Sequence, residues 1–227
     1  MRGTLITKKV NRMKLVIQLA LWIVIIFLGY MVFNAVYEPI QFNKIKEKRY
    51  AKVVDRLKDI RAAQLAHQEI TGTFEKDFDK LVRFIDTAEF TLTQRRDSTV
   101  MDEEYRKTFG VDKYKDIILV DTLGTASVKD SLFKNSTRYK DMMKVPVEGV
   151  DAKFTMDAGT LIKNDNKIPV FEAKVAKKVV LYDLDKDLLM AENQVISVEG
   201  VNGPFITLGS MTEIKTEGNW PTLYDTN

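Results

Sequence analysis

The longest apolar run of the chain lies near its amino terminus. Residues 15–33 contain no charged side chain, and the run stays uncharged as far as Tyr37, just before Glu38. At a rise of about 1.5 Å per residue, a helix over residues 15–37 is roughly 34 Å long. The hydrocarbon core of a bilayer is about 30 Å thick, so this segment predicts a transmembrane helix.

The pattern after this segment is that of an amphipathic helix. Pro39 is expected to bend or break the first helix, because proline lacks an amide donor and clashes with the preceding turn. Over residues 42–70, Val53, Leu57 and Ile60 recur at helical spacing among many alternating basic and acidic side chains. This predicts a solvated stalk helix with a narrow apolar stripe, for which Gly72 is the expected stop.

A short helix and then a sheet are predicted beyond the stalk. Apolar residues at helical spacing indicate the short helix, at Phe74, Phe78, Leu81, Val82 and Ile85. Short runs rich in β-forming residues follow, at Phe90 and Leu92, 117–120, 126–128, Phe154, 170–175 and 179–182. Turn signals separate them, at Leu123-Gly124, Asn164-Asp165-Asn166, 200–204 and Gly209.

We therefore expect an α+β fold with an N-terminal transmembrane helix, an amphipathic stalk helix, a short helix and a mainly antiparallel β-sheet ectodomain. The predicted segments are a cytoplasmic basic tail at 1–14, the transmembrane helix at 15–37, the helical stalk and short helix at 38–90, and a β-rich periplasmic domain at 91–227. If this last segment divides, the boundary is expected near Pro146.

The basic tail sets the expected orientation. It carries Arg2, Lys8, Lys9, Arg12 and Lys14 and no acidic residue. Short basic flanks stay on the cytoplasmic side, so we expect a cytoplasmic amino terminus and a periplasmic carboxyl-terminal domain at a bacterial inner membrane. The alternative is a secretory signal peptide, but its apolar core is only about 7 to 15 residues long and small residues precede its cleavage site. Here the run exits through Phe33-Asn34-Ala35, which favours an uncleaved anchor.

Composition narrows the classes of partner. The chain has 35 basic and 32 acidic residues, and without the five basic residues of the tail 30 basic residues remain against 32 acidic ones. The exported part is therefore slightly acidic, which argues against nucleic-acid binding. The chain has no cysteine, so disulfides, thiol nucleophiles and zinc–thiolate sites are excluded.

One resemblance concerns the first third of the chain. A membrane helix that continues into residues 52–64, followed by Gly72-Thr73-Phe74 and residues 78–81, resembles the stalk and first loop of type IV pilins and pseudopilins. The chain differs from those families in having no glycine at the start of the apolar run and no acidic residue within it. The resemblance implies an envelope subunit with a helical stalk, and a pilin-like filament subunit is one alternative.

A second resemblance concerns the compartment. Asp followed by Ser or Thr and then a small or apolar residue is similar to the O-glycosylation motif of Bacteroidota envelope proteins. It occurs at Asp86-Thr87-Ala88, Asp97-Ser98-Thr99, Asp121-Thr122-Leu123 and Asp130-Ser131-Leu132. The grouping implies a periplasmic domain, although Asp-Ser and Asp-Thr pairs are also ordinary turn and helix-cap sequences.

Candidate chemistry is sparse, and no catalytic, cofactor-binding or metal-binding residue is predicted. The single histidine, His67, lies on the stalk helix and is expected to be solvated, since a general base needs an enclosed site and an orienting partner. Residues 183–187 begin like a calcium loop, but Leu188 replaces the required glycine and Gln194 the bidentate glutamate. A solvated turn or helix start is expected there instead.

The carboxyl end is predicted to contain a last strand over residues 206–213 with an interruption at Gly209. Trp220 and Tyr224 then form either a surface for a partner or aromatic side chains that fold back over the sheet edge. We expect the second arrangement, because large apolar side chains are usually buried.

The sequence thus predicts a non-enzymatic single-pass inner-membrane protein that acts as a structural or assembly component of a cell-envelope complex, in secretion or pilus-related machinery. Its expected partners are the lipid bilayer and other envelope proteins, in a homo- or hetero-oligomer without nucleic acid. Intramembrane Gln18, Gly29 and Asn34 are candidate helix contacts. A membrane-tethered ligand-binding domain or enzyme is the remaining alternative, and it requires a concave site.

Overall fold

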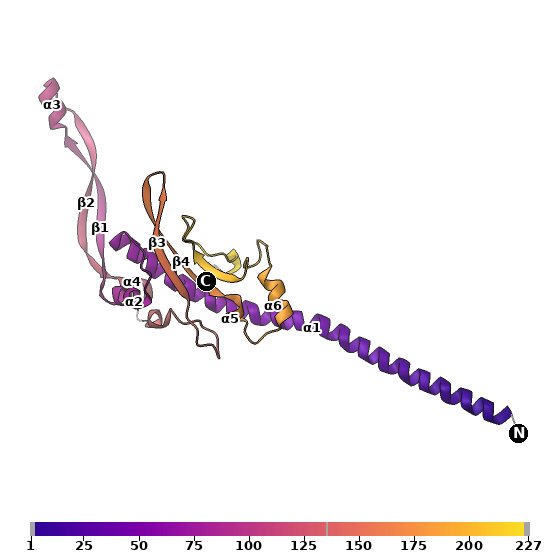
Figure 1. Ribbon diagram of the computed structural model, residues 1–227. Helices are drawn as coiled ribbons and strands as arrows, with labels where there is room; N and C mark the ends of the chain where they lie inside the picture. The colour runs from indigo at the N-terminus through magenta and orange to yellow at the C-terminus, as the bar shows by residue number, and fades with distance from the viewer. Residues whose placement is uncertain (1–2, 135, 225–227) are drawn as a thin grey trace.

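A single long helix organises the molecule. The computed structural model describes residues 3–134 and 136–224, with side chains from Lys14 onward. Positions 1 and 2 of the predicted tail lie outside the described residues. Helix α1 is Gly3–Thr71, 69 residues long, and it projects from the rest of the protein at its amino-terminal end (Figure 1). It ends before Gly72, as predicted, where φ is +79°.

The expected break at Pro39 does not occur. Pro39 lies inside α1, which continues through it. Proline removes only one hydrogen bond of the helix, and the helix extends for many turns on both sides, so cooperativity holds it together there.

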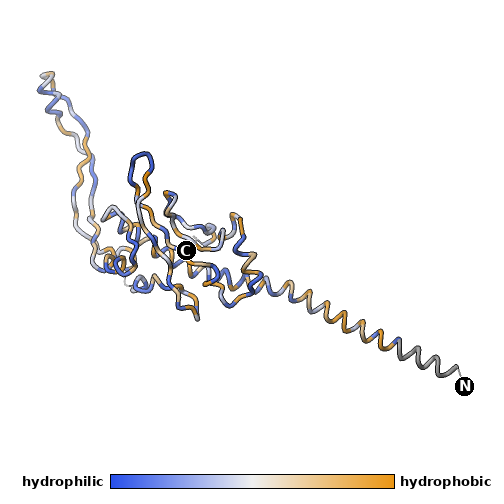
Figure 2. The backbone as a smooth tube through the Cα atoms, in the orientation of Figure 1, coloured by the Kyte–Doolittle hydropathy of each residue, from blue (hydrophilic) through white to orange (hydrophobic). Residues whose placement is uncertain are grey.

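The two halves of α1 have opposite surroundings. Residues 15–33 are exposed all round the helix and are strongly hydrophobic along its length (Figure 2). By length and composition, α1 is the one helix in the described part of the chain that is apolar enough to cross a membrane. From Phe42 onward the helix enters the core. Its buried apolar residues are Phe42, Tyr50, Val53, Val54, Leu57, Ile60, Ala63 and Ala66.

The stalk prediction is therefore wrong in one respect. A narrow stripe was expected on a solvated helix, whereas the second half of α1 is the central element of the hydrophobic core. The stripe is wider because Tyr50, Ala63 and Ala66 bury their side chains as well.

A three-stranded antiparallel sheet packs on this half of α1. Its strands are β3 (Thr155–Lys163), β4 (Asn166–Ala176) and β5 (Phe205–Gly209), in the order β3-β4-β5. The predicted turn at Asn164-Asp165 joins β3 to β4, with φ of +51° and +62°, as a type I′ hairpin turn requires. β4 contains the predicted strand over residues 170–175 and carries the buried side chains of Val170, Phe171, Ala173 and Val175.

Two expectations about the end of the sheet need correction. The run 179–182 is not a strand, because β4 ends at Ala176 and α5 (Lys177–Val180) follows. A short apolar run does not distinguish a strand from a buried helix, and here one helical turn puts Val180 and Leu181 in the core. The last strand stops at Gly209, where a Cβ would lie 2.3 Å from the carbonyl oxygen of Phe171.

A second hairpin projects from the body on the side away from the exposed apolar half of α1 (Figure 1). Helix α2 (Phe78–Thr87) leads into β1 (Glu89–Met101), α3 (Glu103–Phe109), β2 (Tyr114–Ser127) and α4 (Val128–Phe133). Among the described residues, β1 and β2 form a two-stranded sheet and pair only with each other. The predicted turn at Leu123-Gly124 is instead a register shift within this ladder, opposite Leu92 and Thr93. We call β1, α3 and β2 together the arm.

Short elements complete the fold. They are the 3-10 helices η1 (Arg138–Asp141) and η2 (Thr222–Tyr224), and helix α6 (Lys186–Asn193). Pro146, where a subdivision was considered, lies between Val145 and Val147, which are both buried in the core that α1 and the sheet share.

Candidate functional site

The arm is held firmly at its root. Asp77 caps the amino-terminal end of α2, and its carboxylate accepts hydrogen bonds from the backbone N–H groups of Asp79 and Lys80, at 2.8 and 3.1 Å. The backbone N–H of Val128 donates to the carbonyl of Ala88 at 3.0 Å, which closes the two strands at their base. Apolar residues of the flanking helices are buried in the core, namely Leu81, Ile85, Val128 and Phe133. The root therefore fixes the position from which the arm projects.

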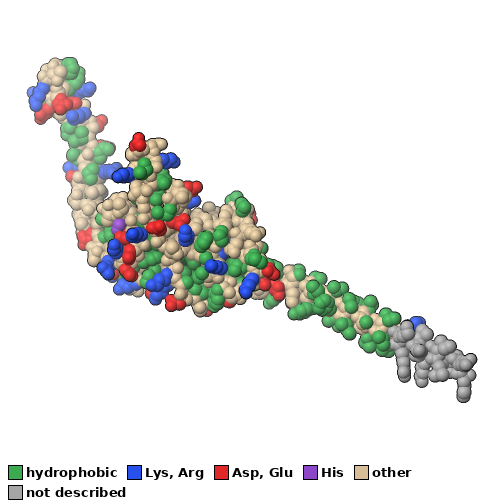
Figure 3. All heavy atoms as spheres, in the orientation of Figure 1, with side chains coloured by type: hydrophobic (Ala, Val, Ile, Leu, Met, Phe, Trp, Pro, Cys, Tyr) green, Lys and Arg blue, Asp and Glu red, His purple; other side chains and the backbone are tan. Residues whose placement is uncertain are grey.

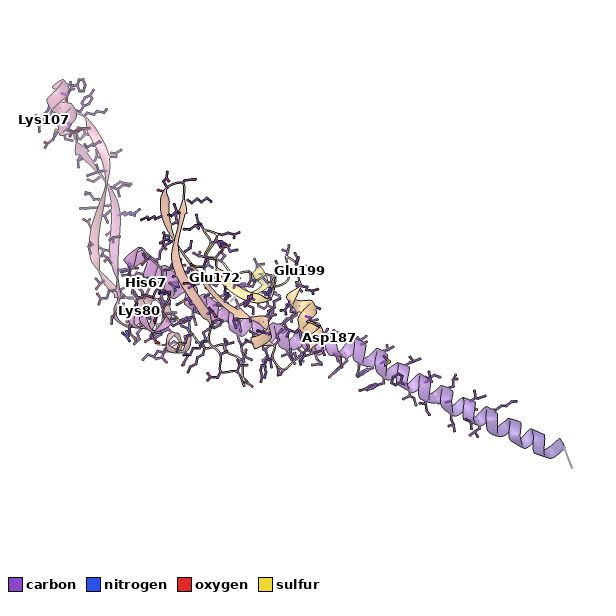
Figure 4. The ribbon with its side chains drawn as sticks, in the orientation of Figure 1. His67, Lys80, Lys107, Glu172, Asp187 and Glu199 are labelled. Carbon is purple, nitrogen blue, oxygen red and sulfur yellow. The ribbon has the colours of Figure 1, made fainter. Side chains whose placement is uncertain are left out.

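Beyond the root the arm has no core of its own. None of the residues 89–127 is buried. A two-stranded hairpin is marginally stable on its own in water, and both strands leave an outer edge of unpaired backbone groups. Figure 4 places Lys107 at the far end of the arm, while His67 and Lys80 lie near its root.

The centre of β2 is apolar on both faces of the ribbon. Ile118 and Val120 lie opposite Asp97 and Arg95 on one face, and are 64% and 56% exposed. Ile117 and Leu119 lie opposite Ser98 and Arg96 on the other face and are half-buried. A continuous apolar run of this kind is typical of strands that are covered on both faces. The space-filling view shows hydrophobic side chains along the arm (Figure 3).

The tip of the arm is a small ordered unit. Asp102 caps α3 by accepting from the backbone N–H of Tyr105, at 3.3 Å. The rings of Tyr105 and Phe109 lie 4.6 Å apart, and the ammonium of Lys113 lies 4.6 Å from the Tyr105 ring. Phe109 is nevertheless 62% exposed. The tip adds a further exposed apolar surface to the arm.

The four Asp-Ser/Thr sequences cluster at this part of the molecule. Thr87 ends α2, Ser98 and Thr122 lie on the arm, and Ser131 lies on α4. All but Ser98 are exposed. The structure therefore gathers these candidate modification sites on and around the arm.

A buried polar cluster joins α1 to the elements that follow β4. The ammonium of Lys177, at 0% exposure, donates to the carbonyl of Glu192 at 2.7 Å, to the carboxylate of Glu192 at 3.0 Å and to the carbonyl of Val201 at 2.7 Å. Lys46 Nζ lies 2.9 Å from the same carboxylate, and the hydroxyl of Tyr50 donates to it at 3.3 Å.

This cluster suits a structural role. An ammonium has three donors, and Lys177 uses all three. Burial lowers the pKa of Lys177, against the opposing effect of Glu192. Burial likewise raises the pKa of Tyr50 far above its ordinary value, and the negative charge of Glu192 adds to this. Nothing in the sequence indicated the cluster, because Lys177-Lys178 looks like an ordinary exposed pair.

His67 is half-buried rather than solvated. Its Nδ1 lies 2.6 Å from the carbonyl oxygen of Thr73 and 3.0 Å from the hydroxyl of Thr71. The ring meets Phe84 edge-on, with centroids 4.7 Å apart. These contacts tie the end of α1 to the following loop and to α2, and no carboxylate is among them.

The acidic stretch at residues 183–187 is used locally. Asp183 forms an ion pair with Arg49, and Asp185 caps α6 by accepting from the backbone N–H groups of Asp187 and Leu188. The expected helix start is confirmed, although no strand precedes it. Within residues 14–134 and 136–224, no group of three or more His, Asp or Glu side chains is placed to hold a metal ion.

Two shallow grooves follow the charged side of α1 next to Pro146. One holds about 640 Å³ and the other about 370 Å³, and they share Lys52 and Pro146 in their walls. Lys44, Lys48 and Lys52, spaced by four residues, line the smaller groove and form no ion pair with the described residues. We call these three the lysine row.

The carboxyl-terminal aromatics fold back onto the molecule. Trp220 and Tyr224 are half-buried against the core cluster, which agrees with the expected arrangement. The ammonium of Lys58, on α1, donates to the carbonyl of Tyr224. Neighbouring Leu223 is 71% exposed. These aromatics contribute to packing, whereas none of the arm residues 89–127 is buried.

Comparisons with known proteins do not identify the chain: no protein-family model matches it, and neither does any curated protein or solved structure.

Proposed function

We propose that the chain is a single-pass inner-membrane protein whose periplasmic domain is a structural or assembly component of a cell-envelope complex, and that the arm is its contact surface. The arm carries the proposal. It is long, has two open edges, and has apolar residues at its centre on both faces, yet none of its residues is buried. Exposed edges and apolar patches of this kind mark sites of protein association.

The proposed membrane anchor rests on the first half of α1. It is apolar on all sides and fully exposed over residues 15–33, which suits contact with lipid. The basic residues before it favour a cytoplasmic amino terminus. Protease added to spheroplasts is expected to digest residues beyond Tyr37, and an intact ectodomain after such treatment contradicts this orientation.

A truncation of the arm tests the proposed contact surface. Thr91 lies opposite Thr125 in the ladder, so residues 92–124 can be replaced by an Asn-Gly turn that closes the two strands near the root. We expect the full chain, extracted in mild detergent, to migrate in a large assembly, and the truncated chain to migrate as a smaller species. The thermal unfolding temperature of the truncated chain should change little, because the arm buries no side chain in the core.

The matched control is Ile162→Ser, at the tip of the β3–β4 hairpin. Ile162 is 69% exposed, which is close to the exposure of Ile118 in the arm. The control should leave the assembly unchanged. A full-length chain that is strictly monomeric under mild extraction, or a truncated chain that still assembles, contradicts the proposal.

A second candidate function is binding of an anionic envelope ligand along the lysine row. The observation in its favour is that three lysines without an ion-pair partner among the described residues lie in the wall of one groove. We expect the triple variant Lys44→Ala, Lys48→Ala and Lys52→Ala to bind inorganic polyphosphate at least ten-fold more weakly than the parent chain. A control that removes Lys107, Lys178 and Lys186, which are exposed elsewhere, should bind as the parent does. Equal binding by all three proteins rejects this candidate.

A further inference from the structure

We propose that two copies of this chain pair through the outer edges of β2, antiparallel, around a two-fold axis at Ile118. This inference rests on the proposed function and names the partner of the arm as a second copy. The product is a four-stranded sheet in the order β1-β2-β2-β1. Three or more strands are what a ribbon such as the arm needs for stability.

The two edges of the arm differ in character. The outer edge of β1 carries Arg95, Arg96 and Asp97 side by side, and charges of this kind protect an edge from pairing. The edge of β2 has no charged residue between Asp116 and Asp121. The four residues between these two are Ile117, Ile118, Leu119 and Val120. The edge of β2 is therefore the one suited to a second strand.

Symmetry restricts how two β2 strands can pair. In an antiparallel ladder, two opposite residues both direct their N–H and C=O groups toward the partner strand, or both away from it. The groups of successive residues point alternately to the two edges of a strand. Two identical strands therefore pair only if opposite residues are both even-numbered or both odd-numbered. The two-fold axis must then lie midway between the two copies of a single residue. The apolar run offers four such centres, at Ile117, Ile118, Leu119 and Val120.

Charge selects among these centres. With the axis at Ile118, Lys115 lies opposite Asp121 of the second copy, twice by symmetry, Ile117 lies opposite Leu119, and Asp116 faces Val120. With the axis at Ile117, Lys115 faces Leu119 and Asp121 faces Lys113, which precedes the strand. With the axis at Leu119, Lys115 faces Leu123 and Asp121 faces Ile117. With the axis at Val120, Lys115 faces Thr125 and Asp121 faces Leu119. Opposite charges across a ladder are stabilising, so the centre at Ile118 fits best.

The pairing also agrees with a membrane anchor. If the two-fold axis lies along the membrane normal, both α1 helices enter the same membrane and both arms lie parallel to its surface. The arm leaves the body at an angle to α1 (Figure 1).

Cysteine substitution tests the axis directly, because the chain has no cysteine of its own. At the axis the two Cα atoms of residue 118 are expected about 4.5 to 5.5 Å apart, within the range of a disulfide. Val120 lies on the same face and is similarly exposed, but its two copies are displaced by four residues, about 13 Å along the strands. Mild oxidation in native membranes should therefore link the Ile118→Cys chain at least ten-fold more than the Val120→Cys chain.

The outcomes of this experiment separately test the axis at Ile118, the second copy as the partner, and the proposed function. Equal or stronger linkage through Val120→Cys overturns the axis at Ile118. If neither variant is linked while both still migrate in a large assembly, the second copy is wrong as the partner and the proposed function stands. If the parent chain and both variants are monomeric, the proposed function fails too.

Charge reversal provides an independent test. Lys115→Asp places two acids opposite each other across the proposed interface and should reduce linkage of the Ile118→Cys chain several-fold. Adding Asp121→Lys should restore it. Within one arm Lys115 pairs with Asp102 and Asp121 pairs with Arg96, and the double reversal disrupts both pairs. Recovery can then come only from contact between copies, and a double variant no better than the single one overturns the proposed pairing.

Discussion

The two hairpins of this protein have similar sequences, but one is packed in the core and the other is exposed. The β3–β4 hairpin buries Val170, Phe171, Ala173 and Val175 against the second half of α1, and β5 pairs with one of its edges. The β1–β2 hairpin pairs over thirteen positions and buries no side chain. Both contain runs of branched apolar residues that favour a strand.

The difference between them lies in what each hairpin meets. Phe171 of β4 packs against Phe74, with ring centroids 4.6 Å apart, whereas Ile118 of β2 is 64% exposed. A β-forming sequence therefore specifies a strand, and the burial of that strand depends on a surface supplied from elsewhere in the chain or from another chain.

The largest expected effect comes from removing a buried aromatic side chain of the β3–β4 hairpin. Phe171→Ala should lower the free energy of unfolding by about 3 to 5 kcal/mol, because it removes a fully buried ring and leaves a cavity. The matched change in the arm, Leu92→Ala on β1, where the side chain is 47% exposed, should cost less than about 0.5 kcal/mol. Urea unfolding of the full chain in detergent, followed by tryptophan fluorescence, measures both. Similar losses for the two variants would erase the contrast between the hairpins.

A second prediction concerns the anchor at the end of β4. Lys177→Met should cost about 3 kcal/mol, since removing one partner of a buried ion pair leaves the other without compensation, although Glu192 keeps Lys46. The neighbouring exposed variant Lys178→Met serves as the control and should cost less than about 0.5 kcal/mol.

The double variant Lys177→Met with Glu192→Leu sharpens this prediction. Replacing a buried pair by apolar residues is often neutral, so the double variant should unfold at a higher urea concentration than Lys177→Met alone. A double variant that is less stable than the single one indicates that the contacts of Glu192 with Lys46 and Tyr50 stabilise the fold even without Lys177.

Local signals in the sequence located most elements correctly. Gly72 ends α1, Asn164-Asp165 turns β3 into β4, and the acids near residue 185 start α6. These features depend on backbone conformation and capping, which a few adjacent residues determine. The α+β class and the antiparallel pairing followed from the same signals.

Features that depend on distant contacts were missed. The run 179–182 was assigned to a strand because periodicity alone does not separate a short strand from a buried helical turn. Lys177 was overlooked because its burial depends on acceptors 15 and 24 residues later in the chain. The apolar run 117–120 was recognised as a strand, but nothing near it shows that it projects from the body.

A third prediction concerns Gln64, which joins α1 to the loop before α2 and to β3. Gln64, fully buried on α1, accepts from the backbone N–H of Glu75 at 3.0 Å and donates to its carbonyl at 2.5 Å. The same amide lies 3.1 Å from the sulfur of Met156 in β3. Gln64→Ala leaves both backbone groups unsatisfied and should cost about 2 kcal/mol. Gln68→Ala, one turn later, is the control and should be near neutral; equal losses would remove the special role of Gln64.

The smallest expected effect lies at the root of the arm. The hydroxyl of Tyr139, which packs beside Phe133 of α4, donates to the carboxylate of Asp86, and this hydrogen bond raises the pKa of Tyr139 to about 12 from an ordinary value of 10.0. A raised pKa stabilises the folded state below the ordinary value, and this stabilisation is lost as the pH rises through the folded value. Tyr139→Phe should therefore cost about 1 kcal/mol at neutral pH, and the difference from the parent chain should shrink between pH 10 and 12. Tyr105→Phe, at the unsupported tip of the same arm, should show no difference at any pH. If the Tyr139 difference persists unchanged above pH 12, the root is held by packing of the ring alone, and the hydrogen bond to Asp86 contributes nothing to how firmly the body carries the arm.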